Sequence, residues 1–311
     1  MGKDFRFGVV ISDSPSWEQL KARAITAESL GYSTLVMPDH LRKQFPPLVA
    51  LAAIAAVTSR ITLGTMVLAS GIRDPVMTAR EAAMVQLISQ GRFELGLGAG
   101  WLQGDFHATG TDFPAGRSAL IDRFAETLEV ITRLFDGETL DVHGRFHQLS
   151  GAYLWPPVPV KPPIVIGGGS SRVLALAARY GDAASIMPRL RSGLPGGHLT
   201  EDASLASFQR KSDRLAELAG ARWPSMNIST TVFFVHLGPG KASYLDWVAT
   251  KLPLPREQIG QSPLVLAGEL DEVCEAILAR RQLLGLNYFL VKDEVMHTFA
   301  PVIARLAEAK I

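Results

Sequence analysis

The chain has 311 residues, of which 47% are hydrophobic, and its formal net charge at pH 7 is +1. This near balance, without a run of lysine or arginine, argues against a surface for nucleic acid or membranes. The single cysteine, Cys274, excludes an intrachain disulfide and a multi-cysteine metal cluster, and its apolar helical surroundings predict that it is buried. No apolar stretch approaches the ~18 to 20 residues of a membrane span, and the chain enters a strand-like run at once, so we expect a cytoplasmic protein.

Strand-like and helix-like segments alternate along the chain. Apolar runs of strand length occupy residues 5–11, 33–38, 61–68, 92–98, 163–168, 182–187, 227–235 and 286–291. Helical patterns follow the first four of them, at residues 17–31, 46–59, 74–89 and 117–135. Such alternation predicts parallel strands, and eight units favour a single α/β domain over residues 1–311, a closed (β/α)₈ TIM barrel. A doubly wound open sheet is the alternative.

Two segments do not fit the repeating unit. Residues 137–162 include "HGRFHQLSG" and a proline-rich run, and residues 238–262 include "LPLPREQIGQ". The alternating pattern resumes after each of them. We therefore predict insertions after the fourth and seventh strands of the barrel.

The ends of the second and fourth strands carry candidate site residues, because barrel enzymes place their chemistry at the carboxyl ends of the strands. Asp39 and His40 follow the second strand, where they are either catalytic or a loop cap with a solvated histidine. Ala99, Gly100 and Trp101 follow the fourth strand. Their small residues allow close backbone approach, and Trp101 either lines a site or belongs to the core.

Three glycines and two serines follow the fifth strand. Gly167, Gly168 and Gly169 leave the strand, and Ser170 and Ser171 begin the next helical pattern. Unpaired amides and the positive end of a helix predict a phosphate there, with glycines that let the backbone approach it. The spacing matches neither the P-loop nor the dinucleotide-binding fingerprint. A glycine-rich turn with a serine cap is the alternative.

Motifs of other enzyme classes are missing from the sequence. There is no Gly-x-Ser-x-Gly elbow and no His-Glu-x-x-His, and His143 and His147 have no third ligand nearby in the sequence. The sequence therefore argues against a hydrolase or a zinc enzyme, and we expect no metal site.

Several segments together resemble the luciferase-like monooxygenase superfamily of flavin- and deazaflavin-dependent oxidoreductases. They are "LVMPDH", "RITLGTMVL", "RDPVMTAREAAMVQLISQGRFELGLGAGW", "IGGGSSRVLALAARYGDAAS" and "AGELDEVCEAILARRQLLGLNYFLV". The resemblance covers residues 5 to about 295 and implies a barrel with a flavin or deazaflavin across its mouth. Within the superfamily, "PDH", "GRFELGLGAGW" and "GGGSSR" are most similar to the branch that uses coenzyme F420.

The resemblance also implies roles for single residues. Asp39 and His40 would face the deazaflavin ring, with His40 as the residue that moves a proton. Met66 and Val67 match a position where the family commonly has a cis peptide bond. The backbone of Ala99, Gly100 and Trp101 would line the ring. The residues that would hold the phosphate are Gly167, Gly168, Gly169, Ser170 and Ser171.

The sequence departs from the family's hexose-phosphate dehydrogenases at two places. Trp101 stands where those enzymes carry a glutamate, and Leu41 to Gln44 stand where they carry a tryptophan. These departures argue against sugar-phosphate oxidation. Trp101 instead suggests a flat or apolar substrate, and Trp101 and Arg189 are the candidate substrate residues.

Taken together, the resemblance implies an F420-dependent oxidoreductase that transfers a hydride between the deazaflavin and a small organic substrate. An FMN-dependent monooxygenase that uses molecular oxygen is the alternative, because it shares the fold and the phosphate site. A non-catalytic flavin- or deazaflavin-binding protein is a second alternative. Since members of the family are commonly homodimers, we expect a homodimer.

Overall fold

Eight parallel strands form a closed barrel in the computed structural model, which describes residues 3–114, 116–189 and 201–308. Hydrogen bonds between β3 and β5 close the ring. The strands are β1 (Arg6–Val10), β2 (Thr34–Met37), β3 (Thr62–Thr65), β5 (Phe93–Gly98), β8 (Ile164–Gly168), β9 (Ala183–Ile186), β10 (Asn227–Val232) and β13 (Tyr288–Lys292). The predicted TIM barrel is confirmed, and a two-residue strand, β4 (Leu68–Ala69), adds to the edge of β5.

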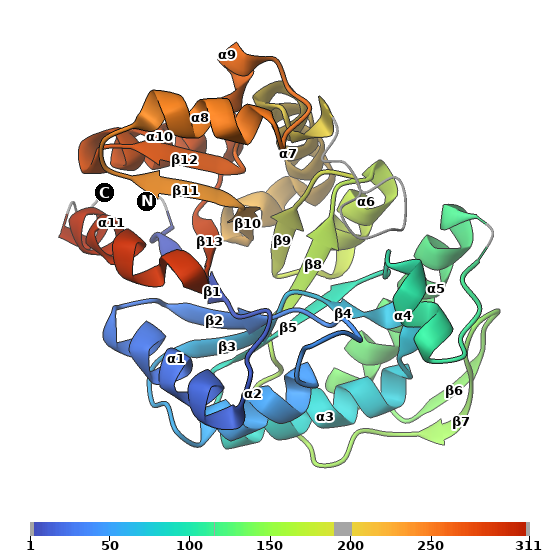
Figure 1. Ribbon diagram of the computed structural model, residues 1–311. Coiled ribbons are helices and arrows are strands. Elements are labelled where there is room, and N and C mark those ends of the chain that lie inside the picture. The colour runs from blue at the N-terminus through green and yellow to red at the C-terminus, as the bar shows by residue number, and fades with distance from the viewer. Residues whose placement is uncertain (1–2, 115, 190–200, 309–311) are drawn as a thin grey trace.

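Helices surround the barrel, as Figure 1 shows. They are α1 (Trp17–Ser29), α2 (Pro47–Ala55), α3 (Pro75–Ile88), α4 (Gln103–Ala108), α5 (Arg117–Phe135), α6 (Ser171–Tyr180), α7 (Leu205–Ala219), α8 (Lys241–Ala249), α9 (Arg256–Ile259), α10 (Leu270–Leu284) and α11 (Met296–Glu308). Local sequence explains several of their starts. The Asp74 side chain caps α3 by accepting from the Met77 amide, and Pro75 occupies the first helical position.

Residues of the barrel strands are buried on both faces. All six residues of β5 are buried, as are all four of β2 and of β9. This explains why the strands have continuous apolar runs instead of alternating ones. Cys274 is buried in α10, as the sequence predicted.

The first insertion is a hairpin of β6 (Leu140–His143) and β7 (Gln148–Ala152), which lies beyond α5 in Figure 1. Glu126 on α5 holds its turn by accepting hydrogen bonds from the backbone amides of Phe146, at 2.8 Å, and His147, at 3.3 Å. The buried His147 ring lies 3.0 Å from the Thr127 hydroxyl. His147 therefore helps to pack the hairpin against α5. The described residues contain no group of three possible metal ligands.

The second insertion differs from the prediction. The expected strand at 227–235 is interrupted at Phe233, because the amides of Phe233 and Phe234 both donate to the Leu264 carbonyl, each at 3.0 Å. The chain leaves the barrel there and continues as β11 (Phe234–Leu237), which pairs in parallel with β12 (Val265–Gly268). In Figure 1, α8 and α9 lie with this small sheet at the top of the molecule. The sequence analysis assigned no strand to the residues of β12.

Charged and polar side chains fill the barrel at the amino ends of its strands. Arg6 forms an ion pair with Glu94 and donates a hydrogen bond to the Thr34 hydroxyl at 2.9 Å. The Arg6 guanidinium lies 4.3 Å from the centre of the Tyr288 ring. Burial raises the pKa of the Glu94 carboxyl, although Arg6 opposes this. This group closes one end of the barrel.

No helix within the described residues is both long enough and apolar enough to cross a membrane.

Candidate active site

The carboxyl ends of the barrel strands face the opposite side of the barrel from the Arg6–Glu94 pair. The segments that follow β2 and β5 bring His40, Trp101 and Asp105 together. The segments that follow β8 and β9 bring Gly169, Arg189 and a buried lysine close to one another. These two clusters contain the predicted site residues and several that the sequence did not indicate.

His40 and Asp105 form a hydrogen-bonded pair. His40 Nδ1 donates to one Asp105 oxygen at 2.8 Å, and the Leu41 amide donates to the other at 3.1 Å. The side chain of Asp105 is only 5% exposed, whereas that of His40 is 25% exposed. Because an ionised carboxylate can only accept, a neutral His40 carries its proton on Nδ1. Its Nε2 is then an acceptor, and it has no partner among the described residues.

Trp101 meets the His40 ring edge to face. The ring centres of Trp101 and His40 lie 5.7 Å apart, with an interplanar angle of 88°. The half-buried Ala99 and Gly100 connect Trp101 to the end of β5. Gly100 has a φ of 86°, which favours glycine, and a Cβ there would lie 3.1 Å from the Phe106 ring. The loop therefore fixes Trp101 beside His40, away from the core.

Asp39 lies in a different environment from His40. Its Oδ1 accepts from Arg73 at 2.7 Å, and its Oδ2 accepts from Arg73 at 2.7 Å and from the Ala69 amide at 3.0 Å. The residue is 3% exposed. Asp39 thus anchors the segment between β4 and α3, and its expected contact with a cofactor ring stays a prediction.

The peptide bond between Met66 and Val67 is cis, which confirms the prediction from the family resemblance. The Val67 side chain lies against two glycines of the neighbouring strands. A Cβ on Gly98 would lie 2.6 Å from Val67 Cγ2, and one on Gly167 would lie 2.9 Å from Cγ1. Both glycines therefore make room for Val67 at the mouth of the barrel.

Packing within the chain explains why residue 169 is a glycine, which the sequence alone did not indicate. A Cβ at this position would lie 1.9 Å from the backbone oxygen of Met187. The sequence analysis explained the glycines by close approach to a phosphate, but here the Met187 carbonyl already requires a glycine. A β-branched residue at 169 would displace the chain at the end of β9, so it cannot probe cofactor binding alone.

The amino end of α6 is open to an anion. Ser170 caps the helix by accepting from the Val173 amide at 3.3 Å. The amides of Ser171 and Arg172 have no hydrogen-bond partner within the described residues, as expected for the first turn of a helix. The Arg172 side chain turns toward α5, where it donates to the Ser118 hydroxyl at 2.8 Å. The amides and serines, and not Arg172, are therefore the groups that can bind a phosphate here.

Arg189 is held by a buried ion pair after β9. The Asp202 carboxylate accepts from the Arg189 amide at 2.7 Å and lies 3.4 Å from the Arg189 Nε. Lys211, 8% exposed, donates to the same carboxylate at 2.7 Å and to the Met187 carbonyl at 3.1 Å. Burial alone would raise the pKa of the Asp202 carboxyl, but hydrogen bonds from Lys211, Ser207 and the Arg189 amide lower it to about 2. The pair therefore orients Arg189, whose side chain is 54% exposed.

The sequence analysis missed four residues of these clusters: Arg73, Asp105, Asp202 and Lys211. Asp105 had a usable signal, because it lies only four residues after Trp101, which the sequence had indicated. Asp202 and Lys211 had no such signal in the sequence. Their ion pair beside Arg189 depends on how α7 packs against the barrel.

Comparison with known proteins extends this description. Residues 5–190 match the family model of the luciferase-like monooxygenases. The F420-dependent glucose-6-phosphate dehydrogenase of Kineococcus radiotolerans is 30% identical over 201 residues, which cover 57% of this chain and 58% of that enzyme.

Two solved structures share the fold over nearly the whole chain. One is an F420-dependent secondary alcohol dehydrogenase with an F420–acetone adduct, with a TM-score of 0.79, 17% identity and coverage of 98% of this chain and 99% of that one. The other is a riboflavin lyase with modified FMN, with a TM-score of 0.78, 15% identity and coverage of 99% and 92%. These two structures share the fold, and the family match spans more than half of the sequence. The chain belongs to the luciferase-like monooxygenase family of enzymes.

Proposed function

We propose that this enzyme is an F420-dependent oxidoreductase that transfers a hydride between coenzyme F420 and a small organic substrate. The observation that carries the proposal is the His40–Asp105 pair, which leaves the His40 Nε2 free at the carboxyl end of β2. Such a nitrogen can give or take the proton that accompanies a hydride on a carbonyl or a conjugated double bond. The likeness to two F420-dependent enzymes supports this choice of cofactor.

His40 and its neighbours divide the work in this proposal. The coenzyme, when bound, supplies a ring carbon that carries the hydride. His40 moves the proton through Nε2, and Asp105 holds the ring orientation and the tautomer. Trp101 provides an apolar wall beside His40 that excludes water and favours a flat substrate. Asp39 acts through Arg73, by fixing the loop after β4.

The cofactor would be held by segments on both sides of the mouth. The free amides of α6, with Ser170 and Ser171, would bind its phosphate, since the positive end of a ten-residue helix favours an anion. Gly167, Gly168 and Gly169 shape this turn from within. The backbone at Met66, Val67 and 99–101 would lie along the ring.

An FMN-dependent monooxygenase is the second candidate, because the riboflavin lyase that shares the fold carries a modified FMN. Both candidates use the same phosphate site. They differ in the need for a proton-transferring residue at the ring, which the His40–Asp105 pair would supply for hydride transfer. A non-catalytic role is disfavoured, because such a role gives no reason to leave the Nε2 of a carboxylate-held histidine free. The expected homodimer remains a proposal.

A hydride-transfer assay tests the proposal. Chemically reduced F420 is mixed with the enzyme and a panel of quinones and unsaturated ketones, and oxidation is followed by absorbance under anaerobic conditions. We expect at least one acceptor to be reduced above the uncatalysed rate. Oxygen consumption with reduced FMN, without any anaerobic transfer from reduced F420, would instead support the monooxygenase.

A further inference from the structure

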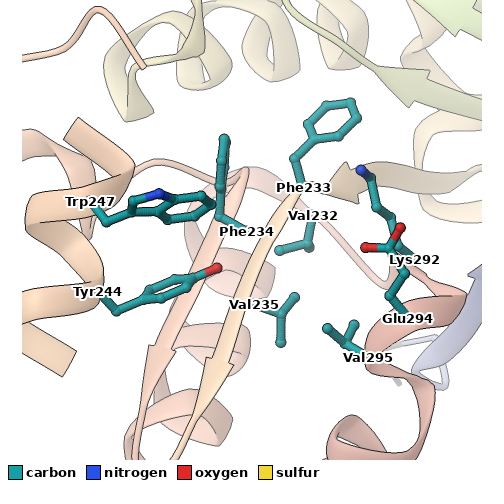
Figure 2. A pocket seen from close by; sticks show the side chains of 9 residues that line it. All are labelled: Val232, Phe233, Phe234, Val235, Tyr244, Trp247, Lys292, Glu294 and Val295. Atoms are coloured by element: carbon teal, nitrogen blue, oxygen red, sulfur yellow. The ribbon is translucent and has the colours of Figure 1, made fainter. Parts of the chain in front are cut away.

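A cavity of about 220 Å³ lies between the ends of β10 and β13 and helix α8. It opens beside the carboxyl ends of two barrel strands, so it lies on the same end of the barrel as His40. Figure 2 shows its lining: Tyr244 and Trp247 stand on one side, and Lys292, Glu294 and the Phe233 ring stand on the other. The lining residues are Val232, Phe233, Phe234, Val235, Tyr244, Trp247, Lys292, Glu294 and Val295.

The aromatic wall of this cavity is held in place by ring contacts. Tyr244 and Trp247, one helical turn apart on α8, have ring centres 5.5 Å apart, and Trp247 meets Phe234 edge to face at 5.9 Å. His236 stacks on Tyr244 at 4.8 Å with an interplanar angle of 19°. Trp247 nevertheless remains 50% exposed. A large ring surface, fixed but still half open to solvent, is suited to contact with another flat ring.

Lys292 gives the cavity a charge. It is the last residue of β13, is half-buried, and forms no ion pair or side-chain hydrogen bond within the described residues. Glu294 also lines the cavity but is exposed at its rim, and it is not within ion-pair distance of Lys292. An ammonium group beside an apolar wall is therefore available to an anion, and a bound carboxylate would compensate for its partial loss of hydration.

We propose that this cavity binds a small aromatic carboxylate, with its ring against Tyr244 and Trp247 and its carboxylate on Lys292. The size fits one ring with a short substituent, because an apolar cavity of about 150 Å³ is enough for benzene. The binding proposal stands on the cavity itself.

Calorimetric titration of the full-length protein with benzoate, without added cofactor, tests the binding proposal. We expect benzoate to bind. The uncharged benzamide should bind at least about tenfold more weakly, because it cannot make the charge-assisted contact with Lys292. Lys292→Met should weaken benzoate by a similar factor, whereas Lys292→Arg should retain most of the affinity. Trp247→Leu should weaken benzoate severalfold through the lost ring contact.

Lys161→Met is the matched control. Lys161 is an exposed lysine in the first insertion, away from the cavity, and it pairs with Asp136. This variant should bind benzoate like the parent protein. Lys292→Gln replaces Lys292→Met if thermal unfolding shows that the latter does not fold. No heat of binding at millimolar benzoate, or affinity equal to the parent's in folded Lys292→Met or Lys292→Gln, would overturn the proposal. A parallel titration with coenzyme F420 reports on the proposed function separately, so the two can fail independently.

Discussion

Carboxylates are buried at both ends of the barrel, but they are used differently. At the amino ends of the strands, Glu94 pairs with Arg6 inside the barrel. At the carboxyl ends, Asp105 and Asp202 are also buried, and each holds a side chain of the candidate active site. Those side chains are His40, 25% exposed, and Arg189, 54% exposed.

This difference separates stability from chemistry. The Arg6–Glu94 pair contacts barrel residues at the amino ends of the strands, away from the candidate active site, so its loss should affect folding. A buried carboxylate that orients an exposed base or cation can act on a ligand while staying rigid itself. The comparison assigns the largest losses of activity to variants at the carboxyl ends of the strands, and the largest loss of stability to variants at the amino ends.

Replacement of His40 should have the largest effect. His40→Ala removes the group that moves the proton, so turnover should fall by about 10²- to 10⁴-fold. Affinity for the cofactor, measured by titration, should change little. His107→Ala is the control, because His107 is an exposed histidine on the neighbouring helix α4. Turnover by His40→Ala at the parent rate across the pH range would remove His40 from the mechanism.

Glu94→Gln should instead destabilise the fold. The change leaves the half-buried Arg6 guanidinium without a counter-charge, which should cost at most about 3 to 5 kcal/mol in free energy of unfolding, the cost for a fully buried pair. Urea unfolding measures this loss. Glu129→Gln is the control, since the exposed Glu129 lies 3.9 Å from Arg133 and should matter by less than about 1 kcal/mol. A folded Glu94→Gln enzyme should keep its turnover, and a selective loss of turnover would break the comparison.

Asp105→Asn should lower turnover by about tenfold to a hundredfold, the effect common for residues that orient a functional histidine. The amide can donate to Nδ1 and so favours the wrong tautomer of His40. The pH profile of turnover should move as well, which a purely structural role would not cause. Asp112→Asn, an exposed change beyond α4, is the control. An unchanged rate and profile would show that His40 works without Asp105.

The smallest effect concerns stability at acid pH. The folded-state pKa of Asp202, about 2, lies below its ordinary value of 3.8, so this carboxylate stabilises the fold above pH 4. That contribution should be lost as the pH falls from about 4 to 2. Urea unfolding at pH 5 and pH 2.5 should therefore show a smaller pH dependence for Asp202→Asn than for the parent protein. Asp213→Asn, an exposed change on α7, should behave like the parent.

Much of the barrel was predictable from sequence, because buried parallel strands have continuous apolar runs and short turn signals. The break at Phe233 was not, since it depends on hydrogen bonds to Leu264, far along the chain. His40 was identifiable from its place after a strand, but its partner Asp105 lies 65 residues away and emerges only when α4 packs over the mouth. The sequence explained the glycines at 167 and 169 by close approach to a phosphate. It could not show that Val67 and Met187 already require glycine at these positions.

A side-by-side titration of the cofactor-free protein with coenzyme F420 and FMN tests the central claim most directly. Changes in absorbance and in protein fluorescence would give both affinities in one buffer. The account predicts that F420 binds and that FMN binds at least about tenfold more weakly. Tighter binding of FMN, or no binding of either cofactor by the folded protein, would contradict it.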